Sequence, residues 1–207
     1  VVLENTCNKG GGSIYTLDEV VHTSNYCKAN GLNIHLDGAR IFNALVETNE
    51  STIDWGRHFD TISICLSKGL GAPVGSLLLG TKDKIKEARR FRKVMGGGMR
   101  QAGYLAAAGI FALENNIPKL KIDNDRAKHI GNILSSLPFV QELKPVQSNI
   151  VIFKLQDDIR DHDFIQILKQ NGVLAVPFGD NTIRFVFHLD ITENMMEQLE
   201  QILPKLI

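Results

Sequence analysis

The sequence predicts an α/β protein with a mostly parallel sheet, helices on both faces of that sheet, and a small carboxy-terminal α+β domain. Two observations lead to this prediction. Up to about residue 138, short apolar runs alternate with helical segments, which is typical of a parallel sheet built from strand–helix–strand units. After residue 139, a strand, a helix, two strands and a final helix are expected in that order, which indicates a small α+β layer.

The first domain is expected to span residues 1–138. Thr16-Leu17-Asp18-Glu19 is a capping box, so a helix should begin after Thr16 and end near Asn30-Gly31. Strands are then expected to lead to Asp37 and to Lys68. The other predicted elements are a helix at 39–47, a strand at 74–79, and helices at 82–94, 100–114 and 117–134, the last of which connects the two domains.

The second domain is expected to span residues 139–207. Gly172 should close one helix of this domain, and Thr192 should cap another. The predicted elements are a strand at 148–153, a helix at 161–171, strands at 173–177 and 182–187, and a helix that ends near Leu203.

Lys68 is the first candidate for chemistry. It lies in Leu66-Ser67-Lys68-Gly69-Leu70-Gly71, directly after the apolar run 61–66. A lysine at the end of a buried strand is poorly placed for a surface charge. A desolvated amine is partly neutral and reacts with carbonyl groups. For this lysine alone, the alternative is a side chain that extends to solvent at a strand exit.

Asp37 is the second candidate, because it ends the short strand Asn33–Leu36. Ligands of open α/β sheets bind beyond the carboxyl ends of the strands, so Asp37 and Lys68 should project into one crevice. A carboxylate for the ring nitrogen and a lysine for the aldehyde are the protein groups that pyridoxal phosphate requires. The alternative for Asp37 alone is a helix cap. Arg40 lies about one helical turn further on and is expected to face the same crevice.

Arg184 is the third candidate. It lies within the apolar strand Thr182–Phe187, where an arginine is unfavourable without an anionic partner. Its planar guanidinium suits bidentate binding of a substrate carboxylate. The alternative is a structural ion pair with an acid of the first domain.

Ser67 and Arg100 are weaker candidates for binding a phosphate group. Ser67 adjoins Lys68 and offers a hydroxyl donor. Arg100 follows Gly96-Gly97-Gly98, a loop that could bring a cation to a phosphate of the same or a neighbouring subunit. A plain interhelical loop is the alternative for this segment.

Four segments carry a family resemblance: Leu3-Glu4-Asn5-Thr6, His35-Leu36-Asp37-Gly38-Ala39-Arg40-Ile41, the run from Cys65 to Ser76, and the run from Gly96 to Gly103. In this order they resemble the low-specificity threonine aldolases, which have the aspartate-aminotransferase-like (type I) fold of pyridoxal-phosphate enzymes. One position departs from the family pattern, since Cys7 stands where Glu-Asn-Thr-His-Asn has its histidine.

The resemblance implies cleavage of L-threonine, L-allo-threonine and related β-hydroxy-α-amino acids to glycine and an aldehyde, as part of amino-acid metabolism. It also implies that Lys68 and Asp37 bind the cofactor, that Arg40 contacts the cofactor or the substrate carboxylate, and that Arg184 holds that carboxylate. The family commonly forms dimers of dimers. A β-eliminating lyase of the same fold and a noncatalytic fragment are the alternatives.

The resemblance also leads us to expect the carboxy-terminal portion of a longer enzyme, inactive by itself. The chain opens inside the apolar run Val1-Val2-Leu3, whereas family members carry a further segment ahead of this position. By resemblance, that segment contains the phosphate-binding turn and a histidine that stacks on the cofactor.

Composition argues against several other classes of protein. The 207 residues include 23 Lys and Arg and 23 Asp and Glu, so no net field favours nucleic acid or an anionic membrane. No apolar run approaches the length of a membrane-spanning helix. Three scattered cysteines indicate a reducing, cytoplasmic environment. The histidines show no pairing with other ligand residues, so no catalytic metal is expected.

Overall fold

The computed structural model describes residues 1–206, which form two compact units. Unit 1 contains Val1–Thr6 and Ile14–Lys119, and unit 2 contains Cys7–Ser13 and the chain from Leu120 onward. This division differs from the expected boundary near residue 138. Helix α6 (Leu120–Leu134) was expected to be a connector, but it buries Ala127, Ile130 and Leu134 in the core of unit 2 and therefore belongs to that unit.

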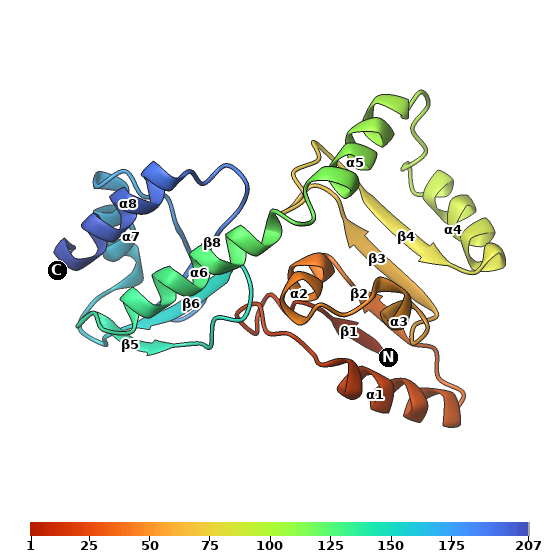
Figure 1. Ribbon diagram of the computed structural model, residues 1–207, viewed down its shortest axis with the longest axis horizontal. Coiled ribbons are helices and arrows are strands. Elements are labelled where there is room, and N and C mark those ends of the chain that lie inside the picture. The colour runs from red at the N-terminus through yellow and green to blue at the C-terminus, as the bar shows by residue number, and fades with distance from the viewer. Residues whose placement is uncertain (207) are drawn as a thin grey trace. The chain divides into compact units, whose positions relative to one another are not determined.

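Unit 1 is built on a four-stranded sheet with the order β1-β2-β3-β4 (Figure 1). Strands β1 (Val2–Glu4), β2 (His35–Asp37) and β3 (Thr61–Cys65) are parallel, and β4 (Ser76–Gly80) runs antiparallel to β3. The mostly parallel sheet predicted from the sequence is thus confirmed.

The helices of unit 1 follow the prediction closely. They are α1 (Leu17–Ala29), α2 (Ile41–Thr48), α3 (Thr52–Gly56), α4 (Lys82–Val94) and α5 (Gly103–Asn115). The capping box at Thr16 is confirmed. Helix α5 begins three residues later than predicted, after Gln101 with a left-handed φ of 49°. Helix α3, a single short turn, was not predicted.

The core of unit 1 joins its first three helices to the sheet. Leu36 of β2 packs with Val20 of α1, with Ile41, Ala44 and Leu45 of α2, and with Trp55 of α3. The Trp55 indole donates a hydrogen bond to Glu50 at 2.8 Å, so this buried ring keeps its polar atom paired.

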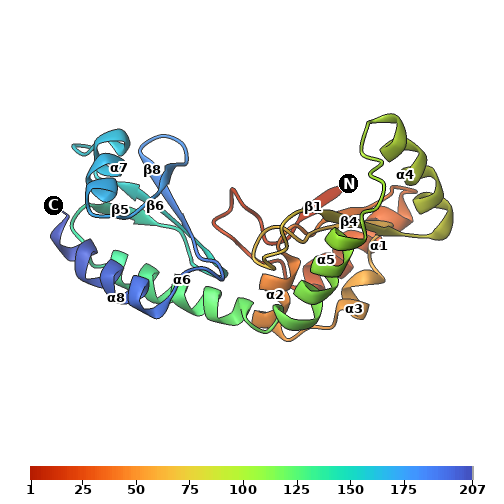
Figure 2. The same ribbon diagram turned by 90° about the horizontal axis from the view of Figure 1, so that it is seen from above.

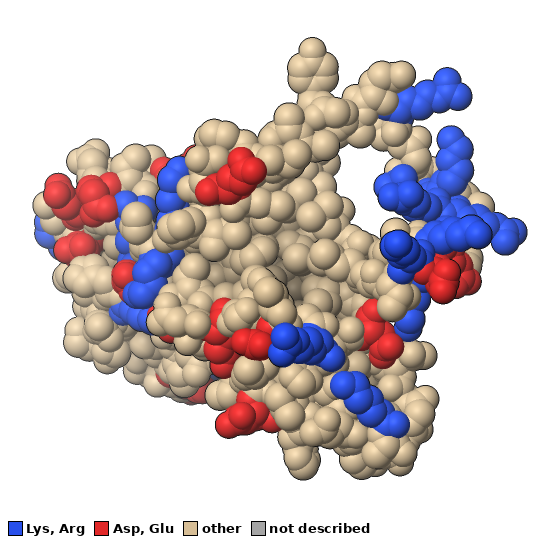
Figure 3. All heavy atoms as spheres, turned by 45° about the vertical axis from the view of Figure 1, so that its right-hand side comes forward, with Lys and Arg blue, Asp and Glu red and all other residues tan. Residues whose placement is uncertain are grey.

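Strand β4 and helix α4 contribute little to this core. All five residues of β4 are exposed, and α4 buries none of its residues. Figure 3 shows Lys and Arg side chains gathered on this part of the surface, as expected for a helix with basic residues Lys82, Lys84, Lys86, Arg89, Arg90, Arg92 and Lys93. Part of the sheet therefore stays uncovered by the described residues.

Unit 2 is an antiparallel sheet with the order β5-β6-β8-β7, packed with helices. Its strands are β5 (Val140–Leu143), β6 (Ile150–Leu155), β7 (Val176–Pro177) and β8 (Thr182–Val186). Besides α6, its helices are α7 (Asp161–Gln170), α8 (Glu193–Ile202) and a 3₁₀ turn at Leu203–Lys205. Helices α6 and α8 lie next to each other (Figure 2). The predicted α+β layer is confirmed, whereas β5 was missed because its central residues are exposed and polar.

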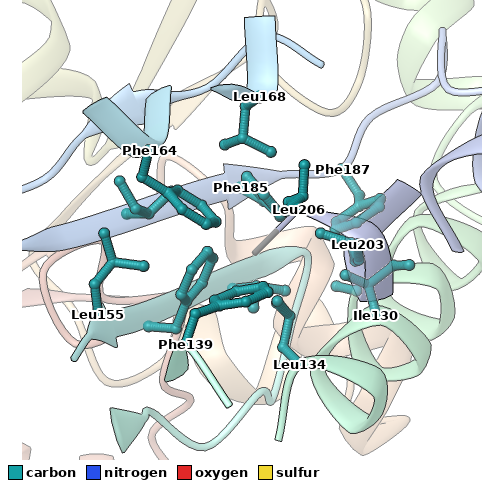
Figure 4. Close-up of a cluster of buried hydrophobic side chains, with 14 of the residues drawn as sticks. Ile130, Leu134, Phe139, Leu155, Phe164, Leu168, Phe185, Phe187, Leu203 and Leu206 are labelled. Atoms are coloured by element: carbon teal, nitrogen blue, oxygen red, sulfur yellow. The ribbon is translucent and has the colours of Figure 1, made fainter. Parts of the chain in front are cut away.

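An aromatic cluster forms the centre of unit 2 (Figure 4). The ring centroids of Phe139 and Phe164 are 5.0 Å apart, and those of Phe153 and Phe185 are 5.3 Å apart at 73°. These tilted arrangements are the favoured geometry of aromatic pairs. Because Ile183, Phe185 and Phe187 face this core, Arg184 lies on the opposite face of β8.

The packing beside β2 generates a first prediction. A Cβ atom on Gly38 would lie 2.8 Å from the carbonyl oxygen of Ser63 and 3.3 Å from the side chain of Ile41. Gly38→Ala should therefore push β2 from β3 and lower the free energy of unfolding by about 1–3 kcal/mol. Urea unfolding would measure this, with Gly56→Ala as the control because no atom lies within 4 Å of its added Cβ. Equal stabilities of the two variants would contradict the prediction.

Asp123 generates a second prediction, on pH dependence. This α6 carboxyl is 1% exposed, its Oδ2 has no hydrogen bond, and its Oδ1 is 4.0 Å from Arg126. Burial raises the pKa of Asp123 from 3.8 to about 6, Asp190 adds to this rise, and Arg126 and His188 oppose it. The folded state thus holds a proton that the unfolded chain releases, so stability should fall as the pH rises from about 4 to 6.

Asp123→Asn cannot ionise at this position and should lose this component of the pH dependence. Unfolding free energies measured from pH 4 to pH 7 would show it. The control is Asp125→Asn on the same helix, an exposed acid paired with Lys121. Parallel pH profiles for wild type and Asp123→Asn would refute the assignment.

Candidate functional site

The carboxyl ends of three parallel strands meet at one edge of the unit 1 sheet. Glu4, Asp37 and Ser63 are in register across β1, β2 and β3. Backbone hydrogen bonds continue past the strands, from Asn5 N to Asp37 O at 3.0 Å and from Gly38 N to Ser63 O at 2.8 Å. This is the edge at which open α/β sheets bind ligands.

Asp37 ends β2 at this edge and is half-buried. Its Oδ1 accepts a hydrogen bond from Ala39 N at 3.1 Å, which holds the carboxylate in a local turn. The helix-cap alternative is not observed, because the cap of α2 is Arg40 and no side chain caps that helix. The Asp37 carboxylate therefore does not cap a helix, and the hydrogen bond from Ala39 N holds it at the end of β2.

Lys68 follows the neighbouring strand β3 by three residues. Leu66 and Leu70 turn into the protein, and hydrogen bonds from Leu66 N to Gly75 O and from Gly71 N to Lys68 O close the turn. The same turn leaves Ser67 and Lys68 exposed. The sequence-based expectation that Lys68 is buried at the end of a buried strand is therefore wrong. In the described structure, β3 is only half-buried and Lys68 is exposed in the turn that follows it.

Arg40 and Arg100 occupy different settings. Arg40 is half-buried immediately before α2 rather than in its first turn, so it remains close in sequence to Asp37. Arg100 is exposed in the segment between α4 and α5. No hydrogen bond or ion pair of the described residues links Arg100 to the strand ends.

Asn5 is a residue of this edge that sequence reasoning missed as a site residue. Its side chain is fully buried. Its Oδ1 accepts from Tyr15 N at 3.3 Å, whereas its Nδ2 has no hydrogen-bond partner among residues 1–206. An unpaired buried donor is unfavourable by about 1–3 kcal/mol. The signal in the sequence was a polar amide two residues after the apolar run Val1–Leu3.

Arg184 lies in unit 2, opposite Ile152 of β6 and Val176 of β7. Its Nη1 donates to Asn8 Oδ1 at 3.0 Å, and its guanidinium lies 4.5 Å from the centre of the Phe178 ring. Its Nε is buried without a partner. Among the described residues of unit 2, no acid forms an ion pair with Arg184.

The predicted residues thus divide between the units. Unit 1 contains Asp37, Arg40, Ser67, Lys68 and Arg100, and unit 2 contains Arg184. Within residues 1–206, no group of three or more acidic, histidine or cysteine side chains is arranged to hold a metal ion. None of the described helices combines the length and the apolar character needed to cross a membrane.

Two relatives of this chain are named for the same activity. It is 38% identical over its whole length to a probable low-specificity L-threonine aldolase of Schizosaccharomyces pombe, covering 52% of that protein. It is 35% identical to low-specificity L-threonine aldolase 1 of Arabidopsis thaliana, with 93% of this chain and 54% of that protein aligned. The chain therefore spans about half the length of these relatives.

The fold is also found among solved structures. A putative aromatic amino acid beta-eliminating lyase/threonine aldolase from Exiguobacterium superposes on the whole chain with a TM-score of 0.83, at 22% identity and over 61% of that structure. At this identity the likeness concerns the fold. Sequence assigns the family directly: residues 1–158 match the beta-eliminating lyases, and the chain belongs to that family.

Proposed function

We propose that this chain forms part of a pyridoxal-phosphate enzyme that cleaves L-threonine, L-allo-threonine and related β-hydroxy-α-amino acids to glycine and an aldehyde. One observation carries the proposal: Asp37 ends β2, and Lys68 follows the carboxyl end of the adjacent parallel strand β3. The names of the relatives support the choice of reaction.

The residues at this edge fit the chemical groups of pyridoxal phosphate. Asp37 offers a carboxylate to a protonated ring nitrogen, and the exposed amine of Lys68 is accessible to an aldehyde. Asn5 Nδ2 is a buried donor that lacks an acceptor. A ligand with anionic oxygens would supply one.

Each residue then has a distinct part in the reaction. Lys68 would hold the cofactor aldehyde through its side-chain amine. Asp37 would face the ring nitrogen of the cofactor and stabilise a proton there, and Arg184 would bind the substrate carboxylate so that the Cα–Cβ bond is aligned for cleavage. Arg40 contacts the cofactor or that carboxylate, whereas Ser67 and Arg100 are assigned to the phosphate. Bound pyridoxal phosphate supplies the electron sink for the cleaved bond.

A second candidate is β-elimination on an amino acid by the same fold. The matched family is described by that activity, and the Exiguobacterium neighbour is described by both activities. The products separate the two candidates, because aldol cleavage yields glycine and an aldehyde, whereas β-elimination yields a 2-oxo acid, ammonia and the group lost from Cβ.

We further propose a cytoplasmic enzyme that assembles as a dimer of dimers. Cys7, Cys27 and Cys65 are all free thiols, which suits a reducing compartment. The exposed apolar side chains of β4 and α5, including Leu77, Leu78 and Phe111, suit burial in a larger assembly.

Lys68→Ala tests the cofactor assignment in the full reading frame that contains these 207 residues. With pyridoxal phosphate added, wild type should show the visible absorption band of a lysine-bound cofactor and release glycine and acetaldehyde from L-threonine. Lys68→Ala should lose the band and at least 1,000-fold of the activity, on the order of 4 kcal/mol. Lys28→Ala, an exposed lysine of α1, is the control and should match wild type.

Two results would change the proposal. A band that persists unchanged in Lys68→Ala, or is absent from wild type, would remove the cofactor assignment. A normal band in wild type with 2-oxobutanoate and ammonia as the products from L-threonine, and no glycine, would leave the site standing and favour the β-eliminating reaction.

A further inference from the structure

The loop Cys7–Ser13 packs within unit 2, although the residues that flank it in the sequence belong to unit 1. Lys144 Nζ donates to Lys9 O at 3.0 Å, and Ser148 Oγ donates to Gly12 O at 2.7 Å. The loop fits closely, because a Cβ atom on Gly12, whose φ is +77°, would lie 2.1 Å from Ser148 Oγ. These contacts fix the backbone on both sides of Gly10 and hold the loop against unit 2.

Asn8 is the residue of this loop that reaches the guanidinium of Arg184. Its Oδ1 accepts from Nη1 at 3.0 Å. Phe178 follows β7 and lies 4.5 Å from the guanidinium carbon, over one face of the group. Its backbone is held by a 2.8 Å hydrogen bond from Phe178 N to Thr182 O. Two fixed neighbours therefore restrict the position of Arg184.

A guanidinium has two edges that can bind a carboxylate through two parallel hydrogen bonds. One edge presents Nη1 and Nη2, and the other presents Nε and Nη2. Asn8 occupies Nη1, whereas Nε is buried without a partner. The unsatisfied donor is thus on the edge that Asn8 leaves open.

From this geometry we propose that Asn8 is a positioning residue that directs the substrate carboxylate to the Nε/Nη2 edge of Arg184. The inference rests on the proposed function, in which Arg184 binds that carboxylate. A neutral amide suits this task, because an acid at the same place would cancel the charge that attracts the substrate. Phe178 assists by stabilising the cation through its ring face.

The test compares two amines that differ in one group: glycine carries a carboxylate and 2-aminoethanol does not. Their dissociation constants are measured from the change in the visible spectrum of the holoenzyme of the full reading frame. Asn8→Ala should weaken glycine binding about tenfold, the effect of one hydrogen bond to a charged group, and leave 2-aminoethanol binding unchanged. Lys9→Ala changes the exposed neighbour of Asn8 in the same loop and should behave as wild type.

A double-mutant cycle with Arg184→Ala decides whether Asn8 acts through the arginine. Arg184→Ala should abolish the preference for glycine, and adding Asn8→Ala should then have no further effect. If Asn8→Ala weakens glycine binding equally in the Arg184→Ala background, Asn8 contacts the ligand directly and the positioning role is overturned. A glycine affinity equal to wild type in Asn8→Ala also overturns it.

Failure of the proposed function would give different results. If Arg184→Ala keeps the preference for glycine, Arg184 does not bind the carboxylate, and both its proposed part and the role of Asn8 are refuted. If wild type shows no cofactor band, the proposed function is refuted together with this inference. An unchanged melting temperature for each variant would show that the affinities report binding and not loss of fold.

Discussion

The parallel pairing of β1, β2 and β3 is the constraint on which the candidate site depends. Parallel strands bring their carboxyl ends to the same edge, and here the register aligns Glu4, Asp37 and Ser63. The hydrogen bonds from Asn5 N and Gly38 N extend this alignment into the turns. Side chains that are distant in sequence therefore reach one edge through backbone geometry alone.

In unit 2, the packing of the core determines the position of Arg184, a cation within the apolar strand β8. The aromatic core fixes one face of β8 through Ile183, Phe185 and Phe187. Strand alternation then turns Arg184 to the other face, where Asn8 and Phe178 contact its guanidinium. The packing of the core thus determines where the charge can lie, and local polar contacts determine its orientation.

The parts of the fold that depend on local patterns were predictable from the sequence. Helix caps at Thr16 and Thr192 and the strands before Asp37 and Lys68 follow from neighbouring residues. The exposure of Lys68 and the membership of α6 in unit 2 depend on which distant segments pack against them. Asn5 was missed for the same reason, because an orphaned donor is visible only when its surroundings are known.

The docked loop Cys7–Ser13 has a consequence for how unit 2 is made. Ser148 and Gly12 are separated by 136 positions along the chain, so their contact closes a long loop and is entropically unfavourable to form early. A polypeptide starting at Leu120 would contain the sheet and helices of unit 2 but would lack the amide that contacts Arg184. The loop Cys7–Ser13 is synthesised long before β8. The contact between Asn8 and Arg184 can therefore form only after β8 has also been synthesised.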